Sequence, residues 1–240
     1  MDTLRVATYN IHKCVGIDRR YSPERIVEVL REIEADVIGM QEVVCNSNTH
    51  GRDHQAAFIA RELEMDFCLG ENRKHKGADY GNATLSRFPI KRRCNFDISV
   101  KSYEPRGCLW AEISYEDGKA VHFMNVHMGT SYFERRKQVH KILAGHVLEN
   151  PELRGRRIVG GDFNEWTSGL ATRLFRSRFN TIDPRLHRGA GPSFPSFMPV
   201  LHLDNVYFDD SFELRKAWLH KSRTALVASD HLPVVAEFAI

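Results

Sequence analysis

Five strand-like segments of this chain end in the same polar chemistry, and no other feature of the sequence constrains the fold as strongly. Each is a mainly apolar run that stops at a carboxylate, a carboxamide or an imidazole. They read T-Y-N-I-H at 8–12, G-M-Q-E-V at 39–43, M-N-V-H-M at 124–128, I-V-G-G-D-F-N at 158–164 and A-S-D-H-L-P at 228–233. Polar groups that converge from many strand ends are a usual way to assemble an enzyme site on a rigid sheet. We therefore expect a sheet-based fold with a cleft at one end of its strands.

Periodicity places helices between some of the strands. Strand patterns cover residues 4–11, 36–41, 67–70, 83–86, 94–100, 107–115, 120–127, 157–161, 202–208 and 234–240. Helices are expected from the Ser22-Pro23 start signal, at 54–63, from the capping box at Ser131, and at 168–178. Because strands and helices do not alternate strictly, the pattern predicts a mixed sheet or a pair of packed sheets faced by helices. No linker interrupts it, so residues 1–240 are expected to form one domain.

Composition indicates the cellular location of the protein more clearly than its activity. The net charge of +3 fits a phosphorylated or polyanionic substrate and also a neutral one. The five cysteines form no C-x-x-C pair, which disfavours a disulfide scaffold and favours a reducing compartment. No apolar run approaches the ~18 residues that a membrane span needs, and no signal peptide precedes the first strand pattern. We expect a cytoplasmic protein without an integral membrane segment.

The candidate site residues share a preference for hard cations. They are Asn10, Glu42, Asp162, Asn164, Asp204 and Asp230, with His127 and His231 beside them. Several carboxylates cannot crowd together ionised unless a cation or a proton compensates them. Carboxylate and carboxamide oxygens are the ligands that Mg²⁺, Ca²⁺ and Mn²⁺ prefer. Such a cation beside two histidines suits a reaction that develops negative charge on phosphate oxygens.

Other chemistries have little support in the sequence. It has no closely spaced His/Cys set and no H-E-x-x-H for zinc, and it has no G-x-S-x-G nucleophile elbow. A P-loop and a G-x-G-x-x-G are also absent, which disfavours nucleotide-dependent phosphotransfer and hydride transfer. Water is therefore the expected attacking group.

Taken together, the motifs resemble the endonuclease/exonuclease/phosphatase superfamily over essentially the whole chain. The matching segments are T-Y-N-I-H, M-Q-E-V, N-V-H-M, G-D-F-N, H-L-D-N-V and S-D-H-L-P-V, in the order of the family. The resemblance implies a four-layer α/β sandwich, with two mixed β-sheets packed face to face and flanked by helices. It also implies hydrolysis of a phosphoester that depends on Mg²⁺, with Mn²⁺ as a substitute.

The resemblance also implies a role for each matching residue. By position, Glu42 resembles the main carboxylate ligand of the metal ion in this family, and Asn10 and Asp230 resemble residues that complete or support the metal site. Asp162 corresponds to the residue that orients or deprotonates water, and Asn164 to one that holds the phosphate or that water. The implied contacts to phosphate oxygens come from His127 and from His231, paired with Asp204. Asn82 and Arg106 occupy positions that bind phosphate in some members.

Several residues keep a structural alternative. His12 stands where abasic-site endonucleases carry an aspartate, so it is either a site residue or a structural one. Asn82 is alternatively a turn residue, and Arg106 alternatively pairs with a surface acid. His122 lies out of phase with the site and is expected to be structural. The basic clusters at 73–76, 91–93, 135–137 and 154–157 form either a phosphate-binding rim or solvated faces.

The implied substrate is a phosphodiester, either nucleic acid or a phospholipid headgroup. A phosphomonoesterase that acts on a lipid or inositol phosphate is the alternative. A catalytically inactive binding module on the same fold is a third hypothesis. The presence of Glu42, Asp162, Asn164, Asp230 and His231 together disfavours this third one.

Overall fold

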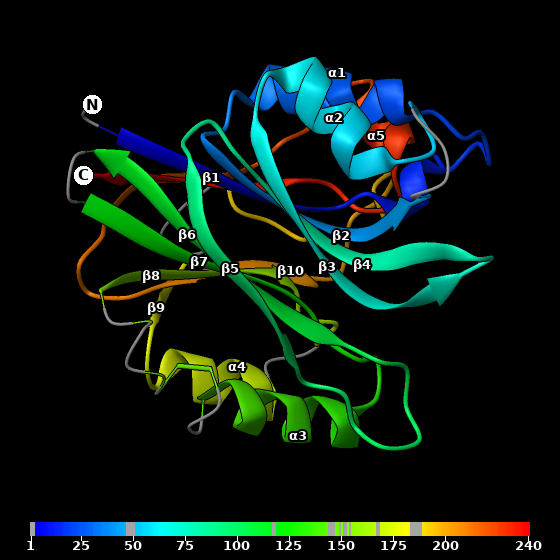
Figure 1. Ribbon diagram of the computed structural model, residues 1–240. Coiled ribbons are helices and arrows are strands. Elements are labelled where there is room, and N and C mark those ends of the chain that lie inside the picture. Colours follow the sequence, from blue (N-terminus) through cyan, green and yellow to red (C-terminus); the bar gives the residue numbers. More distant parts are fainter. Residues whose placement is uncertain are drawn as a thin grey trace.

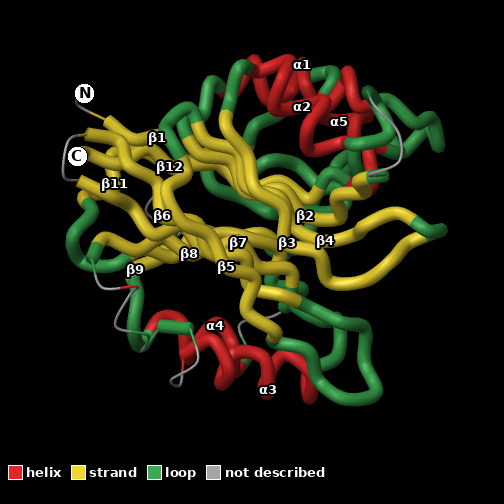
Figure 2. Tube along the Cα trace, in the orientation of Figure 1, coloured by secondary structure: helices red, strands yellow, loops and turns green. Residues whose placement is uncertain are grey.

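Two six-stranded sheets packed face to face form the centre of the molecule (Figure 1). The structure is a computed structural model that describes residues 3–46, 51–116, 119–143, 147, 148, 150, 153, 155–166, 169–182 and 189–240. Helices cover the outer face of each sheet (Figure 2). The predicted four-layer α/β sandwich is confirmed.

The first sheet has the strand order β11-β12-β1-β2-β4-β3. Its strands are β1 (Thr3–Asn10), β2 (Val37–Cys45), β3 (Asp66–His75), β4 (Ala78–Ser86), β11 (Glu213–Leu219) and β12 (Val234–Ala239). β1 and β2 pair in parallel, and the other pairs in this sheet are antiparallel. The parallel pair therefore brings Asn10 and the end of β2 to the same edge of the sheet.

The second sheet has the order β5-β6-β7-β8-β10-β9. Its strands are β5 (Ile90–Asp97), β6 (Gly107–Glu116), β7 (Lys119–His127), β8 (Arg156–Asp162), β9 (Asn180–Thr181) and β10 (Asp204–Phe208). Here β7 and β8 are the parallel pair at the centre. Each sheet thus has a central parallel pair whose carboxyl ends carry polar residues.

The helices divide between the two outer layers. α1 (Pro23–Ile33), α2 (Gln55–Leu63) and α5 (Ala225–Ala228) lie over the first sheet, and α3 (Tyr132–Leu143) and α4 (Leu170–Arg176) lie over the second (Figure 1). A short 3-10 helix, η1 (His12–Cys14), follows β1. Within the described ranges, no helix has both the length and the apolar character that crossing a membrane requires.

Side chains from both sheets fill the space between them. The Phe123 ring on β7 is fully buried there, and it lies against Gly39 of β2, where an added methyl group would come within 2.9 Å of the ring. Glycine at this position therefore allows the sheets to approach each other. A second apolar cluster joins α3 and α4 to the outer face of the second sheet. Burial on both faces explains why the central strands read as nearly continuous apolar runs.

The sequence patterns miss or displace the strands at the edges. β11 is absent from the predicted strands, and β5 covers Ile90–Asp97 instead of 94–100. Both carry several exposed charged side chains, as edge strands commonly do, so neither shows a clear alternation of apolar and polar residues. The third predicted helix is shorter than expected, since α4 covers Leu170–Arg176 and Ser168 lies outside the described residues.

Candidate active site

A β-bulge in β2 directs Glu42 into the site. The register of β2 against β4 shifts between Met40 and Val43, so Gln41 and Glu42 both lie opposite a single residue, Asn82. Glu42 adopts a left-handed φ of 57°. Bulges of this kind re-aim a side chain next to active sites, and a non-glycine residue in this conformation is strained. The bulge allows Gln41 to stay buried between the sheets while Glu42 remains partly exposed.

The second sheet lines up three site residues by register. His127 at the end of β7 pairs with Asp162 at the end of β8, and Asp162 pairs in turn with Asp204 at the start of β10. Neighbouring strands lie about 4.7–4.9 Å apart, so these three side chains converge at one edge. All three are buried.

One oxygen of Asp162 is surrounded by nitrogen atoms from both sheets. Oδ2 accepts a hydrogen bond from Asn10 Nδ2 at 3.1 Å. It also lies 3.6 Å from His127 Nε2 and 3.8 Å from His231 Nε2. Burial and the nearby charge of Asp204 raise the pKa of Asp162 to about 7, against the lowering effect of His231. Asp162 is thus a carboxylate whose proton affinity is matched to neutral pH.

His231 is oriented by a buried chain of polar groups. Its Nδ1 lies 2.8 Å from Oδ2 of Asp204, and the same oxygen accepts a hydrogen bond from Ser193 Oγ at 2.6 Å. Burial alone lowers the pKa of His231, but Asp204, Asp162 and Asp230 outweigh it and raise the pKa to about 10. The ring therefore stays cationic at neutral pH and directs its Nε2–H toward Asp162.

His127 has the opposite character. Burial and the adjacent Arg106 guanidinium lower its pKa well below the usual value, so the ring is neutral. Arg106 Nη1 lies 3.0 Å from His127 Nδ1, and Arg106 also approaches Glu104 at 3.5 Å. Only 7% of Arg106 is exposed. The two imidazoles on either side of Asp162 therefore differ in charge.

Asn164 continues the β8 segment into the site. Its main-chain N–H donates to Asp162 Oδ1 at 2.9 Å, and its Nδ2 donates to the Met128 carbonyl at 2.9 Å. Like Glu42, it has a left-handed φ, here 50°. Asn164 thereby holds the Asp162 carboxylate in place and ties β8 to the loop after His127.

Glu42 already holds a cationic side chain. The Lys13 ammonium contacts Glu42 Oε2, and Asn10 Nδ2 lies 3.4 Å from Oε1. Burial raises the pKa of Glu42, but the charge and the hydrogen bond of the Lys13 ammonium outweigh burial and hold the pKa at about 2. An ionised carboxylate that attracts an ammonium group fits a cation site. Lys13 is a site residue that the sequence patterns did not single out.

Asp230 and His12 complete this side of the site. His12 Nδ1 lies 3.0 Å from the Val15 carbonyl and 3.7 Å from Asp230 Oδ1. Ser229, next to Asp230, donates a hydrogen bond to the Asn10 main-chain carbonyl at 2.8 Å. These contacts join the segment before β12 to the end of β1, so His12 is both close to the site and held by its own loop.

A buried polar layer lies between the sheets beneath the site. Asn125 Nδ2 donates to the carbonyls of Met40 and Ala83 at the bulge, and its Oδ1 accepts from Gln41 at 2.7 Å. Asn82 Nδ2 donates to the carbonyls of Gly107 and Asn125. These groups satisfy the main chain where the bulge interrupts the ladder, which rigidifies the strands that carry Glu42 and His127.

Two sets of side chains offer ligand atoms for a metal ion. Within the described ranges, Asp162, Asp204 and His231 have ligand atoms that lie within 4.8 Å of one another. However, His231 is cationic and Asp204 Oδ2 already accepts two hydrogen bonds. Glu42 and Asp230 offer carboxylate oxygen atoms, which suit Mg²⁺ or Mn²⁺. Asn10 would add a carboxamide oxygen only after turning, since its Nδ2 faces Glu42 and its Oδ1 accepts from the His12 main-chain N–H. The second set fits a divalent cation better.

His122 lies near the other end of β7, away from His127 and Asp162. Its Nδ1 accepts a hydrogen bond from Trp110 Nε1 at 3.1 Å, and the two rings stack. These contacts agree with the structural role predicted for His122.

A two-sheet sandwich that gathers carboxylates and imidazoles at one end of its strands defines a class of phosphoester hydrolases. The chain belongs to the endonuclease/exonuclease/phosphatase family, whose sequence model matches residues 7–231. "Uncharacterized protein YbhP" of Escherichia coli (strain K12) is 33% identical over 247 residues, which span 98% of this chain and 96% of that protein.

Solved structures share the fold at lower identity. An endonuclease/exonuclease/phosphatase from Beutenbergia cavernae DSM 12333 has a TM-score of 0.80 and 22% identity, and the match covers 100% of this chain and 72% of that chain. The mannosyl-6-phosphatase Bt3783 of Bacteroides thetaiotaomicron VPI-5482 has a TM-score of 0.77 and 20% identity, with coverage of 99% and 100%. Truncated Caenorhabditis elegans TDP2 has a TM-score of 0.70 and 19% identity, with coverage of 99% and 98%. These similarities are similarities of fold.

Proposed function

We propose that this protein is a divalent-metal-dependent phosphodiesterase in which water attacks the phosphorus atom and one P–O ester bond breaks, which releases an alcohol and a phosphomonoester. The observation that carries the proposal is the position of Asp162 Oδ2, between the neutral His127 at 3.6 Å and the cationic His231 at 3.8 Å. This arrangement combines a base with two N–H donors, the groups that hydrolysis of a phosphoester needs.

Glu42, Asn10 and Asp230 are the residues that would hold Mg²⁺ or Mn²⁺. Glu42 is ionised and already attracts the Lys13 ammonium, and Asn10 bridges Glu42 and Asp162. When bound, the cation supplies charge stabilisation for the phosphate oxygens. Binding of the cation at Glu42 would require Lys13 to move, since the ammonium now contacts that carboxylate.

We assign to Asp162 the role of accepting a proton from the attacking water. A pKa of about 7 lets this carboxylate take up a proton near neutral pH. The main-chain N–H of Asn164 and the Asn10 carboxamide hold its two oxygens, which fixes the direction of proton transfer. Asp204 takes no direct part in this proton transfer, because its Oδ2 accepts hydrogen bonds from His231 and Ser193.

The two histidines would bind the non-bridging oxygens of the phosphate. His231 offers a cationic Nε2–H, held in place by Asp204. His127 offers a neutral Nε2–H, since Arg106 donates to its other nitrogen. Direct phosphate contacts from Arg106 and Asn82 stay predictions. In the structure Arg106 faces His127, and Asn82 donates both its amide hydrogen bonds to carbonyls.

The charge of the site favours a diester over a monoester. A phosphodiester carries one negative charge and a monoester about two near neutral pH. Of the two imidazoles, only His231 carries a charge, while Arg106 is committed to His127 and Glu104. One divalent cation and one imidazolium supply enough positive charge to bind a singly charged diester next to the negative charge of Asp162. A nucleic acid or a phospholipid headgroup remains the proposed source of the diester.

The test compares a generic diester with the matching monoester. Bis-p-nitrophenyl phosphate and p-nitrophenyl phosphate are assayed with chelator, with Mg²⁺ and with Mn²⁺. We expect hydrolysis of the diester that disappears with chelator and returns with either cation. Full turnover in chelator would refute the mechanism, and a preference for the monoester would support a phosphatase.

We also propose a reducing, cytoplasmic location. All five cysteines are free, and four of them are buried. Free buried thiols are typical of proteins that fold in a reducing compartment.

A further inference from the structure

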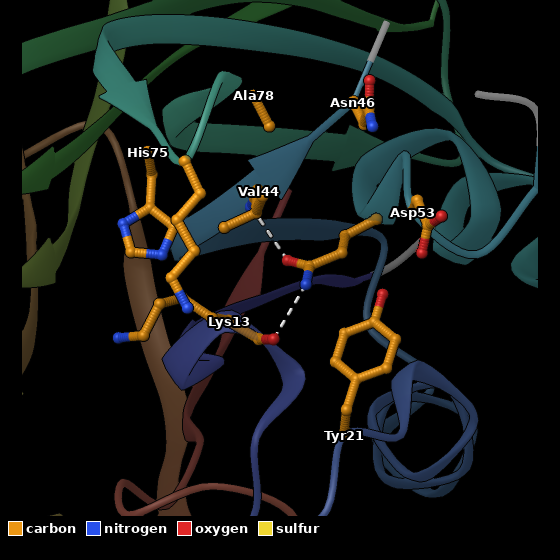
Figure 3. A pocket seen from close by; sticks show the side chains of 9 residues that line it. Lys13, Tyr21, Val44, Asn46, Asp53, His75 and Ala78 are labelled. Carbon is orange, nitrogen blue, oxygen red and sulfur yellow. Dashed lines mark hydrogen bonds between the residues drawn. The ribbon is translucent and has the colours of Figure 1, made fainter. Parts of the chain in front are cut away.

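A pocket with a volume of about 260 Å³ opens beside Lys13, the residue whose ammonium contacts Glu42. Three segments form it: the loop after β1, the end of β2 with the segment leading into α2, and the β3–β4 hairpin. Lys13, Tyr21, Asn46, Asp53, His75 and Lys76 supply its polar lining (Figure 3). We call it the Lys13 pocket. None of these side chains has a role in the mechanism above except Lys13, through its contact with Glu42.

The floor of the Lys13 pocket is built from a buried side chain. Gln55 is 3% exposed. Its Oε1 accepts from the Val44 main-chain N–H at 2.8 Å, and its Nε2 donates to the Lys13 carbonyl at 2.8 Å (Figure 3). One glutamine therefore ties β2 to the loop after β1. Because both hydrogen bonds are to main chain, the floor keeps its shape when the surrounding side chains move.

The two walls of the Lys13 pocket differ in chemistry. Lys13 and His75 lie on one side in Figure 3, and Lys76 follows His75 at the turn of the hairpin. Burial and the charges of Arg73, Lys76 and Lys13 lower the pKa of His75, as a site of positive potential would. Because the Lys13 ammonium contacts Glu42, Lys76 supplies most of the positive charge with which this wall attracts an anion.

Tyr21, Asn46 and Asp53 lie on the other side (Figure 3). Carboxamide, carboxylate and phenol oxygens are acceptors or mixed donors and acceptors, and hydroxyl groups satisfy them well. The Tyr21 hydroxyl donates to the Arg52 carbonyl at 2.7 Å, which leaves its oxygen to accept. This wall suits hydroxyl groups.

The backbone brings this pocket next to the Glu42 carboxylate. His12, Lys13 and Cys14 have φ angles of 44°, 58° and 56°, so three consecutive non-glycine residues adopt the left-handed region. The resulting turn places the Lys13 carbonyl on the pocket floor and its ammonium on Glu42. Strain of this kind persists where the surrounding structure holds it and is common at ligand sites. A group bound in the pocket therefore lies next to Glu42.

Resting on the proposed function, we propose that the Lys13 pocket is the subsite for the alcohol side of the substrate. It takes a small polyhydroxylated group that carries a second anionic substituent. The anion lies against the wall of Lys13, His75 and Lys76, and the hydroxyls lie against Tyr21, Asn46 and Asp53. A nucleobase is disfavoured as the occupant, because proteins commonly bind bases by stacking them on aromatic side chains. Among the residues that line the pocket, Tyr21 alone is a phenylalanine, tyrosine or tryptophan.

The test measures binding without turnover. Glucose 1,6-bisphosphate and glucose 6-phosphate are titrated calorimetrically into the full chain in the presence of chelator, which separates binding from metal-dependent hydrolysis. We expect the bisphosphate to bind about tenfold more tightly, a factor equal to about 1.4 kcal/mol. Lys76→Gln should remove most of that preference, and Asp53→Asn should weaken both sugars equally.

Lys91→Gln is the matched control, since it removes the same charge from an exposed position near the start of β5 that does not line the pocket. Circular dichroism and urea unfolding establish that each variant folds. Equal affinity for the two sugars, no effect of Lys76→Gln, or tighter binding of adenosine monophosphate than of either sugar would overturn the subsite. Hydrolysis of bis-p-nitrophenyl phosphate by the wild type is measured separately. If that hydrolysis is present and the sugar preference is absent, the subsite alone fails.

Discussion

Arg106 and His127 form a buried pair in which Nη1 of the arginine lies 3.0 Å from Nδ1 of the histidine. A guanidinium group has donors and no acceptor, so Nδ1 must accept the hydrogen bond. The ring hydrogen is then on Nε2, which faces Asp162 at 3.6 Å. Arg106 thereby sets both the charge and the tautomer of His127.

Arg106→Lys should impair catalysis although it keeps the positive charge. An ammonium group lacks the planar geometry of guanidinium, and loss of a hydrogen bond to a charged group costs roughly 1.5–3 kcal/mol. We expect kcat to fall about ten- to hundredfold, and ¹⁵N NMR of His127 to show a mixture of tautomers. Arg73→Lys is the control, because Arg73 also pairs with Glu104, at 2.7 Å. An unchanged tautomer in Arg106→Lys would argue against the positioning role.

Asp162→Asn should lower the activity of the protein without lowering its stability. Removal of a general base lowers kcat by about two to four decades. The carboxylate is buried and its pKa is raised to about 7, so its ionised form is costly in the metal-free protein. The free energy of unfolding at pH 8 in chelator should therefore stay the same or rise, as urea unfolding would show. A well-folded variant with near-normal turnover would exclude Asp162 as the base.

His231→Ala should also lower kcat by about two to four decades, since it removes an electrostatic donor. The structure also predicts how the folding stability depends on pH. A folded-state pKa of about 10 exceeds the unfolded value of about 6.5. The His231–Asp204 pair therefore stabilises the metal-free protein fully below about pH 6.5 and progressively less as the pH rises toward 10.

Urea unfolding of the wild type and of Asp204→Asn between pH 7.5 and 10 tests this sign. Asp162 is already ionised over most of this range, so the difference between the two proteins reports mainly on the pair. We expect that difference to shrink as the pH rises. A difference that grows with pH would mean that His231 is neutral in the folded protein.

Lys13→Met should increase the affinity for Mg²⁺. The Lys13 ammonium contacts Glu42, so lysine and metal compete for one carboxylate, and removal of the lysine removes the competitor. Glu42→Gln should have the opposite effect, because it removes the ionised ligand. Isothermal titration of Mg²⁺ into both variants and the wild type measures the change directly. Weaker Mg²⁺ binding by Lys13→Met would show that the ammonium does not occupy the metal position.

Duplex DNA should bind weakly and with a shallow salt dependence. Many residues of the basic clusters already pair with acids: Arg73 with Glu104, Lys74 with Asp79, and Arg157 with Asp209. The slope of log affinity against log salt is about −0.9 per contacted phosphate, so few free cations give a small slope. Fluorescence anisotropy with a labelled duplex measures it. Nanomolar, steeply salt-dependent binding would indicate a dedicated DNA enzyme.

Local sequence patterns predict some strands of this protein correctly and misplace others. Strands such as β1, β7 and β8 could be predicted, because their apolar runs and polar ends are local patterns. The charged edge strands β5 and β11 could not be placed correctly, since an exposed edge imposes no alternation of apolar and polar residues. The helix at α1 was indicated by Ser22-Pro23, although the Ser22 hydroxyl donates to Glu24 instead of capping the helix.

The sequence by itself determined the family, the layered fold and the polar residues at the strand ends, because motif order and periodicity are properties of the chain alone. Only the tertiary structure decided how those residues act on one another. Ser193 reaches Asp204 from within the segment that joins β9 to β10. Lys13 reaches Glu42 through a left-handed turn and a bulge, and Arg106 sets the tautomer of His127 on the neighbouring strand. Such contacts depend on strand register and on backbone conformations that non-glycine residues rarely adopt, and neither leaves a pattern in the sequence.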